Sequence, residues 1–168
     1  IDKVFEEGKC TPKDLNKIFV VNGPGSFTGI RIGLAIAKTM AWALQIDLIP
    51  VSSLELFATT PVSIDFIVSM VDARRNCVYA GIYNQKLESI LEDQYVELDT
   101  ILKKANLLGN TTFVSYDRFD ELSIINPQID YMKMIHKHEN DVVENCHKIN
   151  PVYLKLTEAE EKRNLNEY

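Results

Sequence analysis

Three glycines, Gly23, Gly25 and Gly29, stand where a phosphate-binding loop would stand, between a short apolar run and a long apolar segment. Free backbone amides at the start of a helix favour an anion, which gives this arrangement a chemical meaning. The spacing does not fit the known motifs. A P-loop continues with Lys and then Ser or Thr, whereas Ile30 and Arg31 follow here, and the glycines are one residue too widely spaced for GxGxxG. The pattern therefore favours a tight turn over a phosphate site.

This glycine turn consists of Gly23, Pro24, Gly25, Ser26, Phe27 and Thr28. Gly23 and Gly25 supply unusual backbone angles around Pro24. We expect Ser26 or Thr28 to cap the following helix and Phe27 to plug into the core. Such a turn needs no ligand.

The histidines do not have the spacing of a metal site. His136 and His138 are two residues apart and fall on different sides of an expected helix, whereas a zinc pair on a helix needs a spacing of four. His147 is remote from both. Ser52 and Ser53 lack the nucleophile elbow of a hydrolase and are better explained as helix caps. The sequence predicts no catalytic residue, no metal and no cofactor.

The overall charge excludes a stand-alone nucleic-acid binder. The chain has 168 residues, a net charge of −6 and a pI of about 5.1, so any role near RNA needs a partner with positive charge. Three cysteines without a CxxC motif indicate reduced thiols and a cytoplasmic location. No signal peptide is visible, and Arg31, Lys38 and Gln45 interrupt the longest apolar segment, so we expect no membrane span.

Hydrophobic periodicity predicts a mixed α/β protein with two regions, 1–61 and 62–168, in which a run of antiparallel strands follows alternating strands and helices. The first region holds the glycine turn, and the second holds a hairpin and a charged tail from Thr157 that is expected to fray. Helices are expected to end near Gly8 and to cover residues 29–45, 53–58, 100–108 and, with a break near Asn140, 129–146. Strands are expected at residues 18–21, 48–51, 66–71, 77–83, 89–96 and 111–116.

The helix after the glycine turn is apolar almost all round. Its polar residues Arg31, Lys38 and Gln45 are spaced by seven and form one narrow stripe. An ordinary surface helix needs an apolar face only about 100° wide. This helix must therefore bury two faces, one on its own sheet and the other on either a second helix of the chain or a partner subunit.

Four blocks of the sequence resemble, in this order, the TsaB (YeaZ) family: NGPGSFTGIRIGLAIAKTMAWAL, IPVSSLELFA, VDARRNCVYAGIY and NPVYLKLTEAE. The first block is long and specific to that family, and the others are weaker alone but correctly ordered. The resemblance extends from about Ile18 to Lys162, with little signal between Leu98 and Asn150.

The resemblance implies a two-lobed α/β fold of the actin/hexokinase-like (ASKHA) type with ribonuclease-H-like lobes. It implies a non-catalytic dimerisation and scaffold subunit of the complex that transfers a threonylcarbamoyl group to the tRNA adenosine next to the anticodon. The implied partners are a TsaD-like catalytic subunit and a TsaE-like ATPase, with a homodimer in isolation. Contact with tRNA is expected only indirectly, through the complex.

The resemblance also implies where the partner binds. In the family, the helix after the glycine turn and the helix before it form a helical bundle with TsaD or with a second TsaB. Carried over to this chain, the expected interface residues are Val4, Phe5, Gly29, Ile30, Gly33, Leu34, Ala37, Met40, Ala41 and Leu44.

In one respect the sequence departs from the family pattern. Family members begin with a strand of the form LAIDTS and two further strands before the first helix, and none of these is present here. The first lobe would then be incomplete, so we expect these strands to lie outside the 168 residues of this sequence.

The alternative function is an ASKHA-type enzyme that binds ATP, such as a small-molecule kinase. Asp72 follows a strand and opens the hairpin turn, where an acid can serve Mg²⁺ and phosphate, and Arg74 beside it can contact phosphate. A turn-initiating Asp that satisfies backbone amides and a solvated Arg are the simpler interpretation of both residues.

Overall fold

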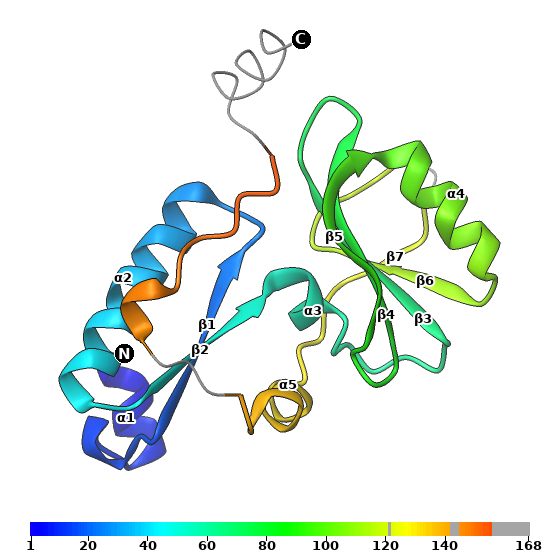
Figure 1. Ribbon diagram of the computed structural model, residues 1–168. Coiled ribbons are helices and arrows are strands. Elements are labelled where there is room, and N and C mark those ends of the chain that lie inside the picture. The colour runs from blue at the N-terminus through cyan, green and yellow to red at the C-terminus, as the bar shows by residue number, and fades with distance from the viewer. Residues whose placement is uncertain (121, 142–144, 156–168) are drawn as a thin grey trace, which may run out of the picture.

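The computed structural model describes residues 1–120, 122–141 and 145–155. These residues form two β-sheets, with the short helix α3 (Ser53–Phe57) between them (Figure 1). Val142 and Val143 of the last expected helix, and the charged tail from Thr157, lie outside the described residues.

The first sheet is a parallel pair, β1 (Lys17–Gly23) and β2 (Asp47–Ser52), connected by α2 (Phe27–Leu44). Parallel neighbours need a crossover connection, and α2 provides it. Helix α1 (Asp2–Gly8) and the 3₁₀ turn η1 (Pro12–Asp14) precede β1. The expected strands and helices of this region are confirmed, although Lys9 rather than Gly8 adopts the left-handed conformation that ends α1.

The second sheet has the strand order β5-β4-β3-β6-β7. The strands β3 (Phe66–Asp72), β4 (Cys77–Asn84) and β5 (Ser89–Glu97) pair antiparallel in succession, which confirms the expected hairpin and third strand. Helix α4 (Leu98–Leu108) covers one face of this sheet, and α3 lies against the other.

The last two strands correct one expectation. β6 (Thr111–Val114) and β7 (Ile124–Ile125) run parallel to their neighbours and do not extend the antiparallel run. The reason is α4, which carries the chain back along the sheet so that β6 enters beside β3 in the same direction.

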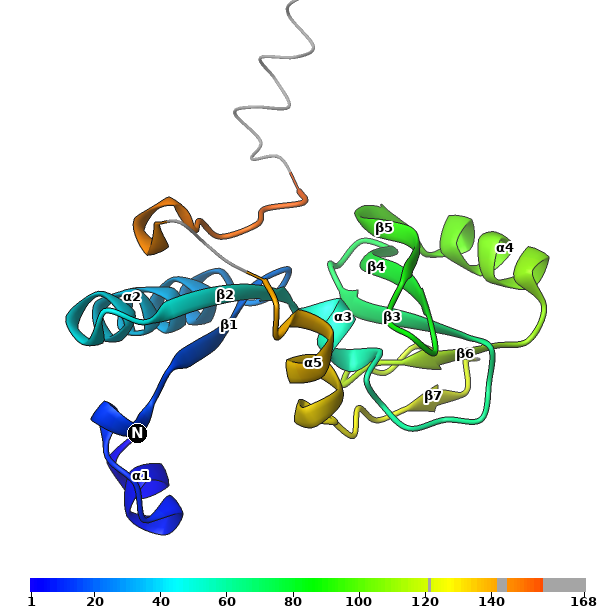
Figure 2. The same ribbon diagram turned by 60° about the horizontal axis from the view of Figure 1, so that its bottom comes forward.

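The end of the described chain returns to the first sheet. Met134 of α5 (Tyr131–His138) packs with Ile49 and Val51 of β2, and Ile149, after the 3₁₀ turn η2 (Cys146–Lys148), packs against α2. Figure 2 shows α5 beside β2 and α3, away from α4. The division between residues 61 and 62 stays a prediction. This packing associates α5 and residues 145–155 with the first sheet.

Candidate functional site

One face of α2 is buried against the chain's own first sheet. Ser26 caps the helix, because its Oγ accepts a hydrogen bond from the backbone N–H of Gly29 at 3.3 Å. Four residues at helical spacing then face Val20, Leu48 and Ile149: they are Ile30, Leu34, Ala37 and Ala41. This corrects the expected interface, because these four of its ten residues are covered inside the chain and are not available to a partner.

The opposite face of α2 is apolar and exposed. Ile32 and Ile36 are 56% and 44% exposed, and Gly29 and Ala43 are exposed beside them. Large apolar side chains that gather on one face mark contact sites more often than scattered ones do. We call Gly29, Ile32, Ile36 and Ala43 the outer face of α2. Trp42, which is 59% exposed, lies about 80° or more further round the helix, beside the polar stripe of Arg31 and Lys38.

Four of the remaining interface residues line a groove between α1 and α2. This groove of about 610 Å³ is mostly apolar, and α1 contributes Val4 and Phe5 while α2 contributes Gly33 and Met40. Val4 is exposed, whereas the other three are half-buried. Leu44, also half-buried, does not line the groove. Residues of α1 and α2 thus line one groove, and Ile36 belongs to both the groove and the outer face. Their use as a partner interface stays a prediction.

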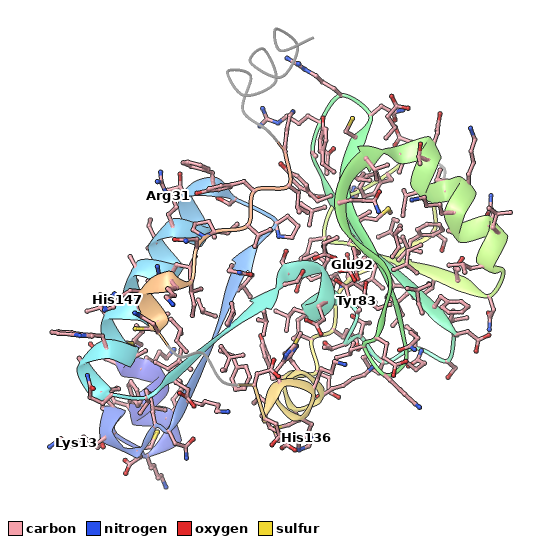
Figure 3. The ribbon with its side chains drawn as sticks, viewed as in Figure 1. Lys13, Arg31, Tyr83, Glu92, His136 and His147 are labelled. Carbon is pink, nitrogen blue, oxygen red and sulfur yellow. The ribbon has the colours of Figure 1, made fainter. Side chains whose placement is uncertain are left out.

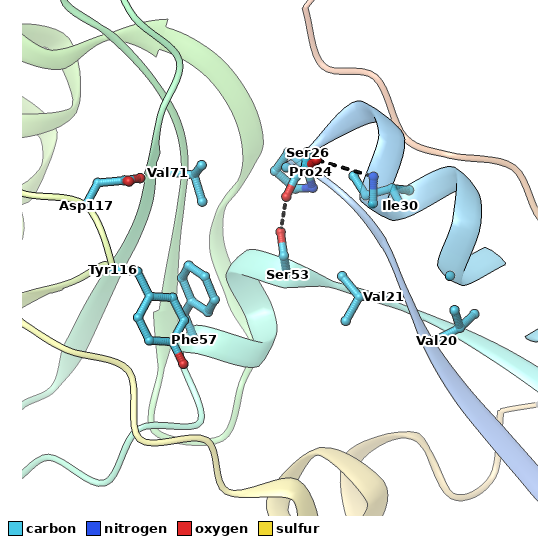
Figure 4. Close-up of a pocket in the computed structure, with 13 residues that line it drawn as sticks. Val20, Val21, Pro24, Ser26, Ile30, Ser53, Phe57, Val71, Tyr116 and Asp117 are labelled. Carbon is cyan, nitrogen blue, oxygen red and sulfur yellow. Dashed lines mark hydrogen bonds between the residues drawn. The ribbon is translucent and has the colours of Figure 1, made fainter. Parts of the chain in front are cut away.

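The glycine turn is held by contacts to distant parts of the chain. Gly23 has a φ of +132°, and a Cβ there would approach the carbonyl oxygen of Val152 to 2.6 Å, so both geometry and space require glycine. Pro24 and Gly25 follow, and the Ser53 hydroxyl donates a hydrogen bond to the Pro24 carbonyl oxygen (Figure 4). Thr28 is exposed on the first turn of α2.

The prediction for Phe27 was wrong. Its side chain is exposed, and its ring stacks on Tyr153 with a centroid distance of 5.2 Å. The Arg31 guanidinium lies 4.7 Å from the centre of the same ring. Figure 3 shows Arg31 on the outside of α2 near its start. Phe27 is therefore part of an aromatic stack on the surface and is not buried in the core.

A pocket of about 510 Å³ opens beside the glycine turn. Ser26 lines it on one side, and Tyr116 and Asp117, which follow β6, line it on the other (Figure 4). Gly25 and Gly29 also line the pocket. Its lining is mostly apolar, and the described lining residues include no Lys or Arg. Asp117 places a carboxylate opposite the helix N-terminus, which disfavours a phosphate in the same space.

Asp72 and Arg74 do not line this pocket. The Asp72 carboxylate accepts the backbone N–H of Arg74 at 2.8 Å, and the Asp72 backbone N–H donates to Asp117 Oδ2 at 2.8 Å. Asp72 is thus a turn-forming residue, and Arg74 is exposed with a φ of 66°. Sequence reasoning missed Asp117, which is the acid that faces the pocket.

No group of three or more His, Cys, Asp or Glu side chains in residues 1–120, 122–141 and 145–155 has the arrangement to hold a metal ion. None of the helices described there is long and apolar enough to cross a membrane.

Comparison with known proteins identifies the family. Residues 1–161 match the model described as "TsaD: tRNA N6-adenosine threonylcarbamoyltransferase". A Bacillus subtilis relative, "tRNA threonylcarbamoyladenosine biosynthesis protein TsaB", is 36% identical over 183 residues, which cover 96% of this chain and 79% of the relative. The chain belongs to the TsaB family. A TsaB from Haemophilus influenzae is 25% identical over 92% of the chain and 76% of its own length.

The fold agrees with solved structures. YeaZ from Pseudomonas aeruginosa superposes with a TM-score of 0.71, at 21% identity, over 89% of this TsaB-family chain and 79% of the solved one. At this identity the likeness shows the fold alone. The prediction of the family and of its α/β ASKHA-like fold is confirmed.

This TsaB-family chain also contains a half-buried polar cluster that sequence reasoning did not find. The Asp93 carboxylate of β5 accepts hydrogen bonds from the hydroxyls of Tyr83 on β4 and Ser52 at the end of β2. Burial raises the pKa of Asp93 and raises that of Tyr83 above its usual range. The available signal in the sequence was an acid in the middle of an expected strand. Its partners could not be predicted, because Tyr83 lies on the neighbouring strand and Ser52 comes from the other sheet. The cluster links the two sheets and has no opening to the pocket described above.

Proposed function

We propose that this protein is a scaffold subunit of the complex that transfers a threonylcarbamoyl group to the tRNA adenosine next to the anticodon. The family membership and the printed name of the B. subtilis relative, a tRNA threonylcarbamoyladenosine biosynthesis protein, support this function. In this proposal the protein catalyses nothing itself and holds a TsaD-like catalytic subunit in its working state.

The observation that carries the proposal is the outer face of α2 beside the groove against α1. Ile36 belongs to both, and Val4 on α1 extends the apolar surface. Two helices that present apolar side chains together can pack against two helices of a partner. The proposed occupant is a TsaD-like subunit in the complex, or a second copy of this chain in isolation.

The charge of the chain fits an indirect role toward RNA. A net charge of −6 disfavours binding of the subunit alone to a phosphate backbone, so in this proposal the tRNA is contacted by the partners. A TsaE-like ATPase joins the complex in this proposal. The location is cytoplasmic, since that is where tRNA is modified.

Two isoleucines provide a matched test. Ile36 on the outer face and Ile90 on β5 are each 44% exposed, so an Arg at either site meets water in the free chain. We expect Ile36→Arg to remain folded but to lose self-association and binding to a TsaD-like protein from the same organism, because the new charge would be buried by the partner. Ile90→Arg should behave as the unchanged protein.

Sedimentation of each variant, alone and mixed with the TsaD-like protein, gives the answer. If Ile36→Arg associates as well as Ile90→Arg does, the outer face is not the interface. Circular dichroism of both variants establishes that they are folded.

The alternative, an ATP-binding enzyme, is separable by calorimetry. It requires phosphate-binding residues near the glycine turn, where Asp117 is the charged side chain among the described lining residues. Binding of Mg-ATP to the isolated chain with a micromolar Kd would favour the enzyme, and absence of binding at millimolar ATP would favour the scaffold.

A further inference from the structure

A histidine lies between two carboxylates where α5 meets α3. Nε2 of His138 is 3.0 Å from Oε1 of Glu55, and Nδ1 of His138 is 2.7 Å from Oδ2 of Asp141. The side chains of His138 and Glu55 are only 15% and 13% exposed, whereas that of Asp141 is 53% exposed. The contact thus joins the last residue of α5 to α3 and to the loop that follows α5.

The geometry fixes how many protons this cluster needs. A neutral imidazole has one N–H, so it can donate a hydrogen bond to one carboxylate only. The lone pair on its other nitrogen then points at a lone pair of the second carboxylate oxygen, and the two repel each other. Both contacts are favourable only when the cluster holds one additional proton. That proton makes the ring an imidazolium, or it protonates one of the two carboxyl groups.

Charged groups from four elements surround the cluster. Glu55 comes from α3, and Lys137 precedes His138 on α5. Asp93 of β5 acts on Glu55, and the Lys17 ammonium of β1 donates hydrogen bonds to the backbone carbonyl oxygens of Glu139 and Asp141. Burial is the largest cause that raises the pKa of Glu55, and it outweighs the opposing effect of His138. The surroundings therefore favour retention of the proton.

The cluster lies where it can fix the junction of the two sheets. Figures 1 and 2 both place α5 beside α3. At its other end, the segment that leads into α5 is held by the hydroxyls of Thr60 and Thr59, which accept the backbone N–H groups of Gln128 and Asp130 at 3.1 and 2.9 Å. Those bonds are neutral, so the His138 end is the part of this attachment that depends on pH.

We propose that Glu55, His138 and Asp141 form a proton-dependent clasp that fixes the end of α5 on α3. The clasp is closed while the cluster holds its additional proton, and it opens as the pH rises and the proton leaves. Its contribution to stability is therefore present at lower pH and lost at higher pH. This inference is independent of the partner interface on α2.

Substitutions that remove the need for the proton test the clasp. In Glu55→Gln the carboxamide can donate to the neutral ring, and in His138→Gln nothing titrates at this position. His136→Gln is the matched control, because His136 is exposed on the same helix (Figure 3). The measurement is urea unfolding of the full chain between about pH 6 and pH 8.5, a range that includes the ordinary histidine pKa of about 6.5.

We expect the unfolding equilibrium constant of the unchanged protein to increase more steeply with pH than that of Glu55→Gln or His138→Gln. The control His136→Gln should behave as the unchanged protein. The increase is about tenfold for each pKa unit by which folding strengthens proton binding. Parallel pH dependence in all four proteins would overturn the proposal.

Amide hydrogen exchange localises the effect. Corrected for the intrinsic pH dependence of exchange, the amides of α5 should open more at pH 8.5 than at pH 6, whereas those of α4 should not. Equal behaviour of the two helices would also overturn the clasp, even if one of the variants proved too unstable for the unfolding measurement.

Discussion

The Tyr83 hydroxyl of β4 donates a hydrogen bond to the Asp93 carboxylate on the neighbouring strand β5. The same carboxylate accepts the hydroxyl of Ser52, which ends β2 in the other sheet. One half-buried acid thus connects both sheets, and its two hydroxyl partners satisfy it without a cation.

The pH dependence of stability should report on Asp93. Burial raises its pKa above the ordinary value of 3.8, so the native state binds the proton more tightly than the unfolded chain. The stability that this gives is complete below that ordinary value and is lost as the pH rises through the raised pKa. Compared with Asp93→Asn, which resembles the protonated form, the unchanged protein should lose stability as the pH rises from about 4 toward neutrality.

Chemical unfolding across this pH range measures the difference, and Glu6→Gln, an exposed acid on α1, is the control that should keep the original pH dependence. A curve for Asp93→Asn that stays parallel to that of the unchanged protein would contradict the assignment.

Gly81 should not tolerate a side chain. A Cβ at this position would collide with Oδ1 of Asp93 and lie 2.9 Å from Cε2 of Tyr83. We expect Gly81→Ala to lower the free energy of unfolding by about 1–3 kcal/mol. Gly33→Ala on α2 is the contrast, since nothing lies within 4 Å of the added methyl group, and it should raise stability by about 0.5–1 kcal/mol. Urea denaturation of both variants decides, and equal effects would argue against the crowding around Asp93.

The two faces of α2 should respond differently to charge. Ala41 is 1% exposed and lies against the first sheet, so Ala41→Glu should cost about 3–5 kcal/mol of folding free energy. Ala43 is exposed two residues further on, and Ala43→Glu should change the free energy of unfolding by less than about 0.5 kcal/mol. Thermal unfolding of the two variants compares them, and a stable Ala41→Glu would show that the helix is oriented differently.

The cap of α2 is Ser26 and not Thr28. Ser26→Ala should destabilise the protein by about 1 kcal/mol, because the backbone N–H of Gly29 loses its acceptor. Thr28→Ala lies within the helix and should have a much smaller effect. A larger loss in Thr28→Ala would reverse the assignment of the cap.

Local signals predicted most of the elements. The apolar run before the glycines and the capping serines placed β1, α2 and α3 to within two residues, because strand and helix ends depend on nearby residues. The direction of β6 could not be predicted in this way. The direction of β6 depends on how α4 crosses the sheet, and the sequence of α4 or of β6 alone does not show this crossing.

The candidate site was predicted in part for a similar reason. Periodicity showed that α2 has two apolar faces, but it did not show which face the first sheet covers. Ala37 and Ala41 were predicted to contact a partner, whereas the structure buries both against the first sheet. Phe27 is exposed because its ring stacks on Tyr153, a residue far along the chain. Asp93 and Asp117 likewise take their roles from distant partners.

The return of residues 145–155 to the first sheet affects how the chain can fold during synthesis. The Lys38 ammonium donates to the carbonyl oxygen of His147, the Val152 N–H donates to the carbonyl oxygen of Asn22, and Ile149 completes the core under α2. The strands of the second sheet come from a continuous stretch, residues 66–125, and can assemble as soon as that stretch leaves the ribosome. The first sheet is thus translated before the second but completes its core after it, and until Ile149 emerges the inner side of α2 is covered by β1 and β2 alone.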